Sequence, residues 1–151
     1  MKKTATSKPS ANTWPEKERY LQFIKGLEIK NLILKSCKAE LVADQVDFAK
    51  EGAFNVHDEC SYKMRDENTC VVTLEYQLAA AYSGQKEKVL SIAATYEVTY
   101  KVSAPMTDEM FGVFSKTSLP LNTWPYFREF ANSIMTRMGL PGVVLPVLKA
   151  E

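Results

Sequence analysis

Two long segments of alternating apolar and polar residues constrain the fold more than any other feature of this chain. From Cys70 to Tyr82 and from about Leu90 to Tyr100, every second residue is apolar or aromatic, the period of a strand with one buried face. The segments are separated by Ser83-Gly84-Gln85, a typical turn sequence. This pattern predicts an antiparallel hairpin whose inner face carries Val72, Leu74, Tyr76, Leu78, Ala80 and Tyr82, then Leu90, Ile92, Ala94, Tyr96, Val98 and Tyr100.

Further strands are expected upstream of the hairpin. The segment 29–34 fits a strand or a helix by pattern alone, and we interpret it as a strand because strands follow it. Residues 54–64 alternate loosely, and 65–68 form a turn. Thr13, with Glu16 at capping-box spacing, predicts a helix that ends near Gly26. Whether 13–26 is a helix or an extension of the first strand stays open.

Two helices are expected after the hairpin. Thr107 is a helix cap followed by Met110, Phe111 and Phe114. A final helix is predicted from about Pro125 to Met138, with Thr123 as its cap, Pro125 in its first turn and Gly139 at its end. Strands that precede a run of helices predict an α+β fold: about four antiparallel strands, with the C-terminal helices packed on one face.

The composition fits one globular domain. The chain has 151 residues, 46% of them hydrophobic, and a net charge of +1, which offers no general attraction to nucleic acid or acidic lipid. No apolar run is long enough to span a membrane. We expect residues 1–12 to be a disordered tail, without the apolar segment of a secretory signal, and 13–151 to be a single domain. Three cysteines favour free thiols and a cytoplasmic location.

The residues that carry chemistry are few and scattered. His57 is the only histidine, and with Cys60 and Cys70 it lacks the four closely spaced ligands of a structural zinc site; Cys37 lies far away. No nucleophile-elbow or phosphate-loop motif is present. Arg128 and Glu129 are neighbours on the predicted helix and point in different directions, so we expect structural roles. The sequence therefore predicts no enzyme, no metal and no cofactor.

Aromatic side chains are frequent on the predicted hairpin and helices. We expect most of these aromatic side chains to lie in the core. One layer of helices leaves the other face of a sheet uncovered, so the apolar faces of the two long strands must be covered by helices, by another subunit or by a bound molecule. The residues we expect to contact such a molecule are Tyr76, Tyr82, Tyr96, Tyr100, Phe111, Phe114, Trp124 and Phe127.

The C-terminal region resembles the main helix and tail of SecB, the bacterial protein-export chaperone family. That family has an aromatic-Pro-Tyr-x-Arg-Glu pattern, then Ser-x-Met, an Arg, a Gly and Pro-x-x-Leu-x-Pro. The matching residues here are Trp124, Pro125, Tyr126, Arg128, Glu129, Ser133, Met135, Arg137, Gly139, Pro141, Val144 and Pro146. The resemblance covers about Tyr20 to the end and is most specific from Trp124 onward.

The resemblance implies an ATP-independent holdase that binds unfolded or precursor polypeptides in exposed apolar grooves and assembles as a dimer or tetramer. Three departures make coupling to the export motor SecA doubtful. Two acidic sheet positions of the family align with Asn31 and Lys35, and a third falls near Ile92. We also expect that the last helix of the family is missing and that an added helix precedes the first strand. The clients could be secreted precursors or an unstable antitoxin.

Two other functions are compatible with the same sequence. A carrier of a small hydrophobic ligand would have a cavity between sheet and helix, lined by Tyr96, Val98, Trp124 and Phe127. A dedicated interaction module would bind a single partner.

Overall fold

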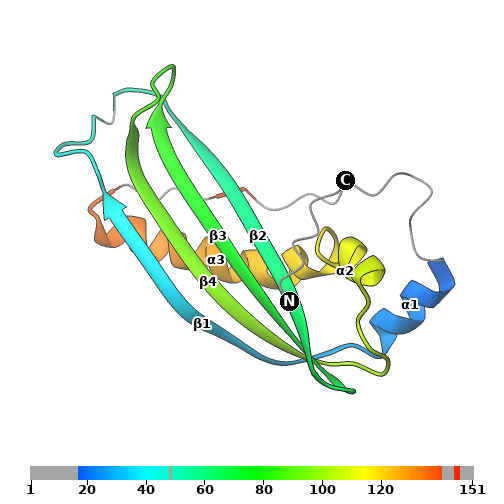
Figure 1. Ribbon diagram of the computed structural model, residues 1–151. Coiled ribbons are helices and arrows are strands. Elements are labelled where there is room, and N and C mark those ends of the chain that lie inside the picture. The colour runs from blue at the N-terminus through cyan, green and yellow to red at the C-terminus, as the bar shows by residue number, and fades with distance from the viewer. Residues whose placement is uncertain (1–16, 48, 141–144, 147–151) are drawn as a thin grey trace.

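The protein is a four-stranded antiparallel sheet with helices on one face, as the α+β prediction states (Figure 1). The computed structural model describes residues 17–47, 49–140 and 145–146. The elements run in the order α1 (Lys17–Lys25), β1 (Glu28–Leu41), β2 (Gly52–Asp66), β3 (Thr69–Tyr82), β4 (Lys88–Lys101), α2 (Asp108–Phe114) and α3 (Ser118–Arg137). The strand order across the sheet is β1-β4-β3-β2, so β1 and β2 are its edges.

The predicted hairpin is the centre of the sheet. Leu74 of β3 lies opposite Tyr96 of β4, and Val72 lies opposite Val98. Gly84 in the connecting turn has a φ of +79°, which glycine adopts without the steric cost that a Cβ brings. The even-numbered residues of both strands face the helices, and most of them are fully buried.

The core lies between this hairpin and α3, which crosses the sheet on its helix-covered side (Figure 1). Phe127, Ala131 and Met135 recur at helical spacing and are completely buried. The ring of Tyr76 stacks on Phe127 with centroids 4.9 Å apart and contacts Trp124 edge-on at 5.5 Å. Such aromatic contacts add to the free energy that burial of the rings already contributes.

Both helices after the hairpin are present, but α3 starts earlier than the sequence predicts. Thr107 caps α2 as expected, accepting a hydrogen bond from the Met110 N–H at 3.2 Å. The prediction that α3 begins near Pro125 was wrong, because the helix begins at Ser118 and Pro125 lies inside it. Thr123 is buried and donates to the Leu119 carbonyl at 2.8 Å instead of capping a helix. Gly139, with a φ of +78°, ends the helix region as predicted.

The helix predicted before the first strand is α1, and it ends at the expected glycine. A Cβ at Gly26 would overlap the side chain of Ser103, so this close approach between the start of β1 and the end of β4 requires a glycine. Phe23 of α1 is buried in the common core. The predicted tail 1–12 and the Thr13 cap lie outside the described residues. None of the described helices is long and apolar enough to cross a bilayer.

Candidate functional site

The sheet is wider than the helical layer that covers it. On β3 and β4 the residues facing α3 are almost all buried, whereas nearly every residue of β1 and the first half of β2 is exposed. Directly paired residues of neighbouring strands point to the same face of a sheet. The register therefore shows which residues of the edge strands β1 and β2 lie on the face that carries α3. Two uncovered apolar rows result, one on each edge strand.

The row on β1, here named the β1 strip, consists of Ile29, Leu34 and Leu41. These residues pair with Tyr100, Tyr96 and Leu90 of β4, all of which face α3. Their side chains are nevertheless 44%, 43% and 37% exposed. Leu32, between them, is partly covered by the core.

The row on β2, here named the β2 strip, consists of Phe54 and Val56. They pair with Ala80 and Leu78 of β3, and they are 41% and 39% exposed. Exposed apolar side chains that continue a core outward are typical of surfaces that bind a partner.

The second half of β2 is covered by α2, which explains where the β2 strip ends. The ring of Tyr62 packs 4.6 Å from Phe111, and its hydroxyl donates to Asp108 Oδ1 at 2.7 Å. Burial, together with the hydrogen bond and the negative charge of Asp108, raises the pKa of Tyr62 far above its ordinary value. Cys60, Tyr62 and Met64 therefore pack against the core.

A hollow of about 210 Å³ adjoins the β2 strip. Phe54 lines it together with Tyr82, Leu90, Met135 and Leu140, so strand, hairpin and the end of α3 all contribute walls. The lining is mostly apolar, and its two charged residues are Asp47 and Lys50. This hollow extends the β2 strip and suits an apolar side chain of a bound chain.

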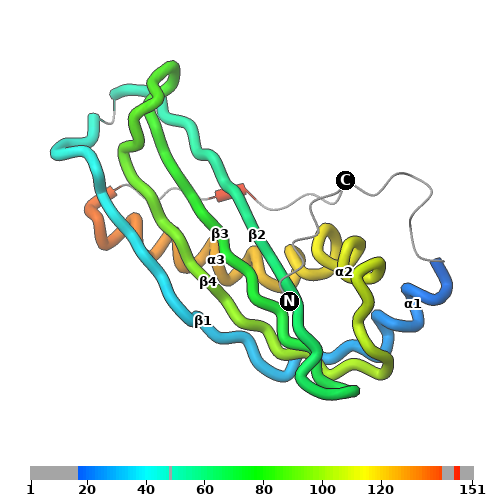
Figure 2. Tube along the Cα trace, in the orientation of Figure 1, coloured from blue at the N-terminus to red at the C-terminus, as the bar shows by residue number. Residues whose placement is uncertain are grey.

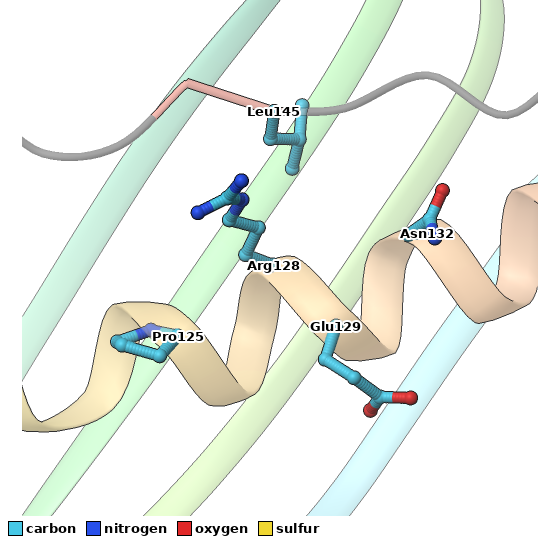
Figure 3. A pocket seen from close by; sticks show the side chains of 5 residues that line it. All are labelled: Pro125, Arg128, Glu129, Asn132 and Leu145. Atoms are coloured by element: carbon cyan, nitrogen blue, oxygen red, sulfur yellow. The ribbon is translucent and has the colours of Figure 1, made fainter.

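A second hollow, of about 340 Å³, lies between α3 and the C-terminal segment. It is lined by Pro125, Arg128, Glu129, Asn132 and Leu145. Figure 3 shows Arg128 and Asn132 directed toward Leu145, whereas Glu129 points away from it. Arg128 and Glu129 thus lie on different sides of the helix, as their spacing predicts.

Most of the aromatic residues expected to contact a bound molecule belong to the core. Seven of them are 7% exposed or less: Tyr76, Tyr96, Tyr100, Phe111, Phe114, Trp124 and Phe127. Tyr82 is partly exposed; its hydroxyl accepts the Asp47 N–H at 2.7 Å, and the ammonium of Lys50 lies 5.2 Å from its ring centre. Neither hollow is lined by the four residues expected around a carrier cavity, Tyr96, Val98, Trp124 and Phe127.

The SecB-type motif residues divide between core and surface. Trp124 is buried, and its indole N–H donates to the Pro146 carbonyl at 2.9 Å. Pro125, Tyr126 and Glu129 are exposed, and Arg128 is half-buried. Pro141 lies outside the described residues. Of the three positions aligned with acidic residues of the family, Asn31 and Lys35 are exposed on β1, whereas Ile92 is buried.

The few nucleophilic and metal-binding side chains do not form a shared site. His57 pairs with Gln77 on the open face of the sheet and reaches Glu59 at 3.5 Å, while Cys60 faces the helices. Burial raises the pKa of the Cys60 and Cys70 thiols to about 11, and the charge of Asp58 adds to the effect at Cys60, so both stay protonated at neutral pH. No metal-binding cluster of three such residues occurs in the part of the chain that the structure describes.

Comparison with solved structures identifies the architecture. The SecB-like chaperone Rv1957 of Mycobacterium tuberculosis, solved in complex with a peptide from the HigA1 antitoxin, superposes with a TM-score of 0.73 over 87% of this chain and 98% of the other, at 17% identity. The chain has a SecB-like fold. The SecB-like resemblance of the C-terminal motif is thereby confirmed at the level of the fold.

Other comparisons contribute little. A protein of unknown function from Streptococcus agalactiae covers 80% of this chain and 97% of its own, with a TM-score of 0.47 and 8% identity. Neither a protein-family model nor a curated protein matches the sequence.

The residues of both strips are not among those that the sequence pattern predicts to contact a bound molecule. Phe54 and Val56 belong to a loosely alternating segment, and Ile29, Leu34 and Leu41 to one that also fits a helix. Their exposure depends on the width of the helical layer, which no local pattern reports. The sequence shows only that these residues are apolar; it does not show the strand order that makes β1 and β2 the edges.

Proposed function

We propose that this protein is an ATP-independent holdase that binds extended segments of unfolded polypeptides along the β2 strip and the adjoining hollow. The observation that carries the proposal is the exposure of Phe54 and Val56 on the same side of the sheet as the core. The proposal also takes support from the SecB-like fold, since the superposed chaperone of M. tuberculosis was solved with an antitoxin peptide.

The physics of such a surface suits clients of many sequences. An unfolded chain offers apolar side chains at intervals and backbone groups without partners, and an edge strand such as β2 offers both an apolar row and unpaired backbone groups. Burial of each large apolar side chain contributes roughly 1.5–3 kcal/mol, so a few contacts give useful affinity without a defined sequence. No nucleotide, metal or catalytic group is needed for this activity, and we propose that the protein is not an enzyme.

The β1 edge supports a proposal about assembly. Ile33 is 37% exposed on the open face of the sheet, next to Leu34, which is 43% exposed on the helix side. An edge strand that is apolar on both faces is suited to pairing with another strand. We propose that β1 is covered by a second copy of this chain in a homo-oligomer, which leaves β2 to the client.

The charges on β1 bear on the partners of this protein. Asn31 and Lys35 are exposed on β1 and carry no negative charge. The Lys35 Nζ lies 4.0 Å from the Glu97 Oε2. A basic docking partner would gain little attraction there, so we propose that coupling to SecA is weak or absent. We propose a cytoplasmic protein whose clients are unfolded precursors or an unstable antitoxin.

Suppression of the aggregation of a denatured test protein, measured without ATP, tests the proposal. Two variants of β2 are compared, one with a new charge on the helix side of the sheet and one with a new charge on the open face. Val56→Asp introduces a carboxylate into the β2 strip and should weaken client binding about tenfold, which corresponds to the loss of roughly 1.4 kcal/mol. Asn55→Asp is the matched control, because Asn55 is the preceding residue, is exposed and pairs with Ala79 on the open face. Equal protection by both variants, or none by the natural chain, would contradict the proposal.

A further inference from the structure

The first half of β2 is exposed on both faces and forms one edge of the sheet. Every residue from 52 to 59 is exposed, and β3 is the only neighbour of β2 among the described strands. Figure 2 shows β2 as the outer strand on the side opposite β1. Its pairing with β3 runs without a bulge from Gly52 to Met64. A regular edge of this kind is a template for pairing with another strand.

The hydrogen bonds of the ladder show which residues of this edge have free backbone groups. The Ser83 N–H donates to the Glu51 carbonyl at 2.9 Å, so these two residues are a hydrogen-bonded pair. In an antiparallel ladder such pairs alternate with pairs that share no backbone bond. Counted along the unbroken register, the N–H and C=O groups of Phe54, Val56 and Asp58 therefore point away from β3. Two of these residues are the β2 strip, so free backbone groups and exposed apolar side chains belong to the same positions.

An antiparallel strand added at this edge would have two distinct rows of side chains. A residue that bonds the backbone of Phe54 or Val56 lies directly opposite it, so its side chain is on the helix side of the sheet. There it adjoins the β2 strip and the apolar hollow that Phe54 lines, which suits apolar side chains. The residues in between lie opposite Asn55, His57 and Glu59, with their side chains on the open face.

The open-face row lies beside negative charge. Glu59 pairs directly with Glu75 of β3, and like charges at such positions destabilise a sheet. Within the described residues, neither carboxylate has an ion pair with a lysine or an arginine; Glu59 has only His57, at 3.5 Å. A cationic side chain on the open face of an added strand would complement this charge.

We propose that a client binds as a fifth, antiparallel strand at the edge of β2, and that preferred client segments alternate apolar residues with lysine or arginine. This binding mode rests on the proposed holdase function. The main-chain bonds do not depend on the sequence of the client, whereas the alternation provides the preference. A segment of the same composition without alternation would place apolar side chains on the open face and should bind more weakly.

The test measures the Kd of a labelled peptide, Lys-Val-Lys-Phe-Lys-Val-Lys, for the full-length chain by fluorescence anisotropy. N-methylation of its three apolar residues removes the N–H groups that would bond to β2, and it should raise the Kd about tenfold. N-methylation of the last three lysines is the matched control, because those N–H groups would point to solvent, and it should change the Kd less than about twofold.

Equal effects of the two modifications, or a larger effect at the lysines, would overturn the proposal. Failure of the unmodified peptide to bind a chain that suppresses aggregation would also overturn it and leave the holdase function intact. A chain that neither binds the peptide nor suppresses aggregation would refute both. A molecular mass that falls in Val56→Asp would show that a second copy occupies the edge, which would overturn the proposal as well.

A second comparison tests the placement of the two rows. Glu59→Gln should raise the Kd of the alternating peptide about threefold, because it removes the charge beside the lysines. Glu67→Gln is the matched control, since Glu67 is exposed in the turn after β2. The peptide Val-Val-Phe-Lys-Lys-Lys-Lys has the same composition without alternation, and it should bind about fivefold more weakly. An unchanged Kd for Glu59→Gln, or equal binding of the two peptides, would refute the proposed preference.

Discussion

At the scale of single residues, the contact between Thr123 and Tyr76 links α3 to the sheet through polar atoms inside an apolar core. The Thr123 hydroxyl donates to the Leu119 carbonyl, so the Tyr76 hydroxyl donates in turn to Thr123 Oγ1 at 2.8 Å. Both residues are buried, and a buried hydroxyl without a partner is costly. This pair therefore fixes the height at which α3 crosses β3.

We expect Thr123→Val to destabilise the protein by about 1–3 kcal/mol, because the Tyr76 hydroxyl would stay buried without an acceptor. Tyr76→Phe should cost less, about 0.5–1.5 kcal/mol, because it removes the group that needs the partner. Urea unfolding at equilibrium measures both. The double variant should cost less than the sum of the two single variants, and strict additivity would show that the two hydroxyls do not interact.

At the scale of secondary-structure elements, the sequence predicts the types of the elements better than their ends. The hairpin β3–β4 follows from period-two alternation, and the end of α3 follows from Gly139. The start of α3 could not be found, because Thr123 and Pro125 have the residue types and spacing of a helix start. Inside the helix, Pro125 removes one backbone hydrogen bond, and packing of Phe127 and Trp124 offsets that loss.

The site could be predicted only in part. The sequence shows which residues are apolar, and the expectation of an incompletely covered sheet holds for β1 and β2. The sequence cannot show that Tyr76 and Phe127 are buried between the sheet and α3 while Phe54 lies outside the area that α3 covers. That distinction depends on the strand order and on one helix covering two strands, both of which are long-range properties.

The junction between α1 and β1 gives a prediction at this scale. Gly26→Ala should destabilise the protein by about 1–3 kcal/mol, because the new methyl group overlaps the side chain of Ser103. Gly112→Ala in α2 is the matched control: it meets no atom within 4 Å, and it should stabilise the protein by about 0.5–1 kcal/mol. Thermal unfolding compares the two. Ser103→Gly should restore most of the stability of Gly26→Ala, and a failure to do so would place the strain elsewhere.

At the scale of the whole molecule, the uncovered edges predict an assembly whose contacts are separate from client binding. Leu34→Asp places a charge in the β1 strip, and it should reduce the mass measured by light scattering toward the 17.0 kDa of one chain. Leu21→Asp is the control, because Leu21 is exposed to a similar degree, 47% against 43%. Val56→Asp should leave the mass unchanged. A natural chain that already measures 17.0 kDa would refute the proposed oligomer.

The division of the sheet into two covered strands, one uncovered strand and one half-covered strand has a consequence for how freely its residues can change. The inner pair of strands, β3 and β4, makes most of the buried contacts with α3, so substitutions there should cost more stability. Residues on the outer pair can change with little penalty to folding, since they contribute few buried contacts. The sequence of an edge strand can therefore change while the scaffold formed by β3, β4 and α3 persists.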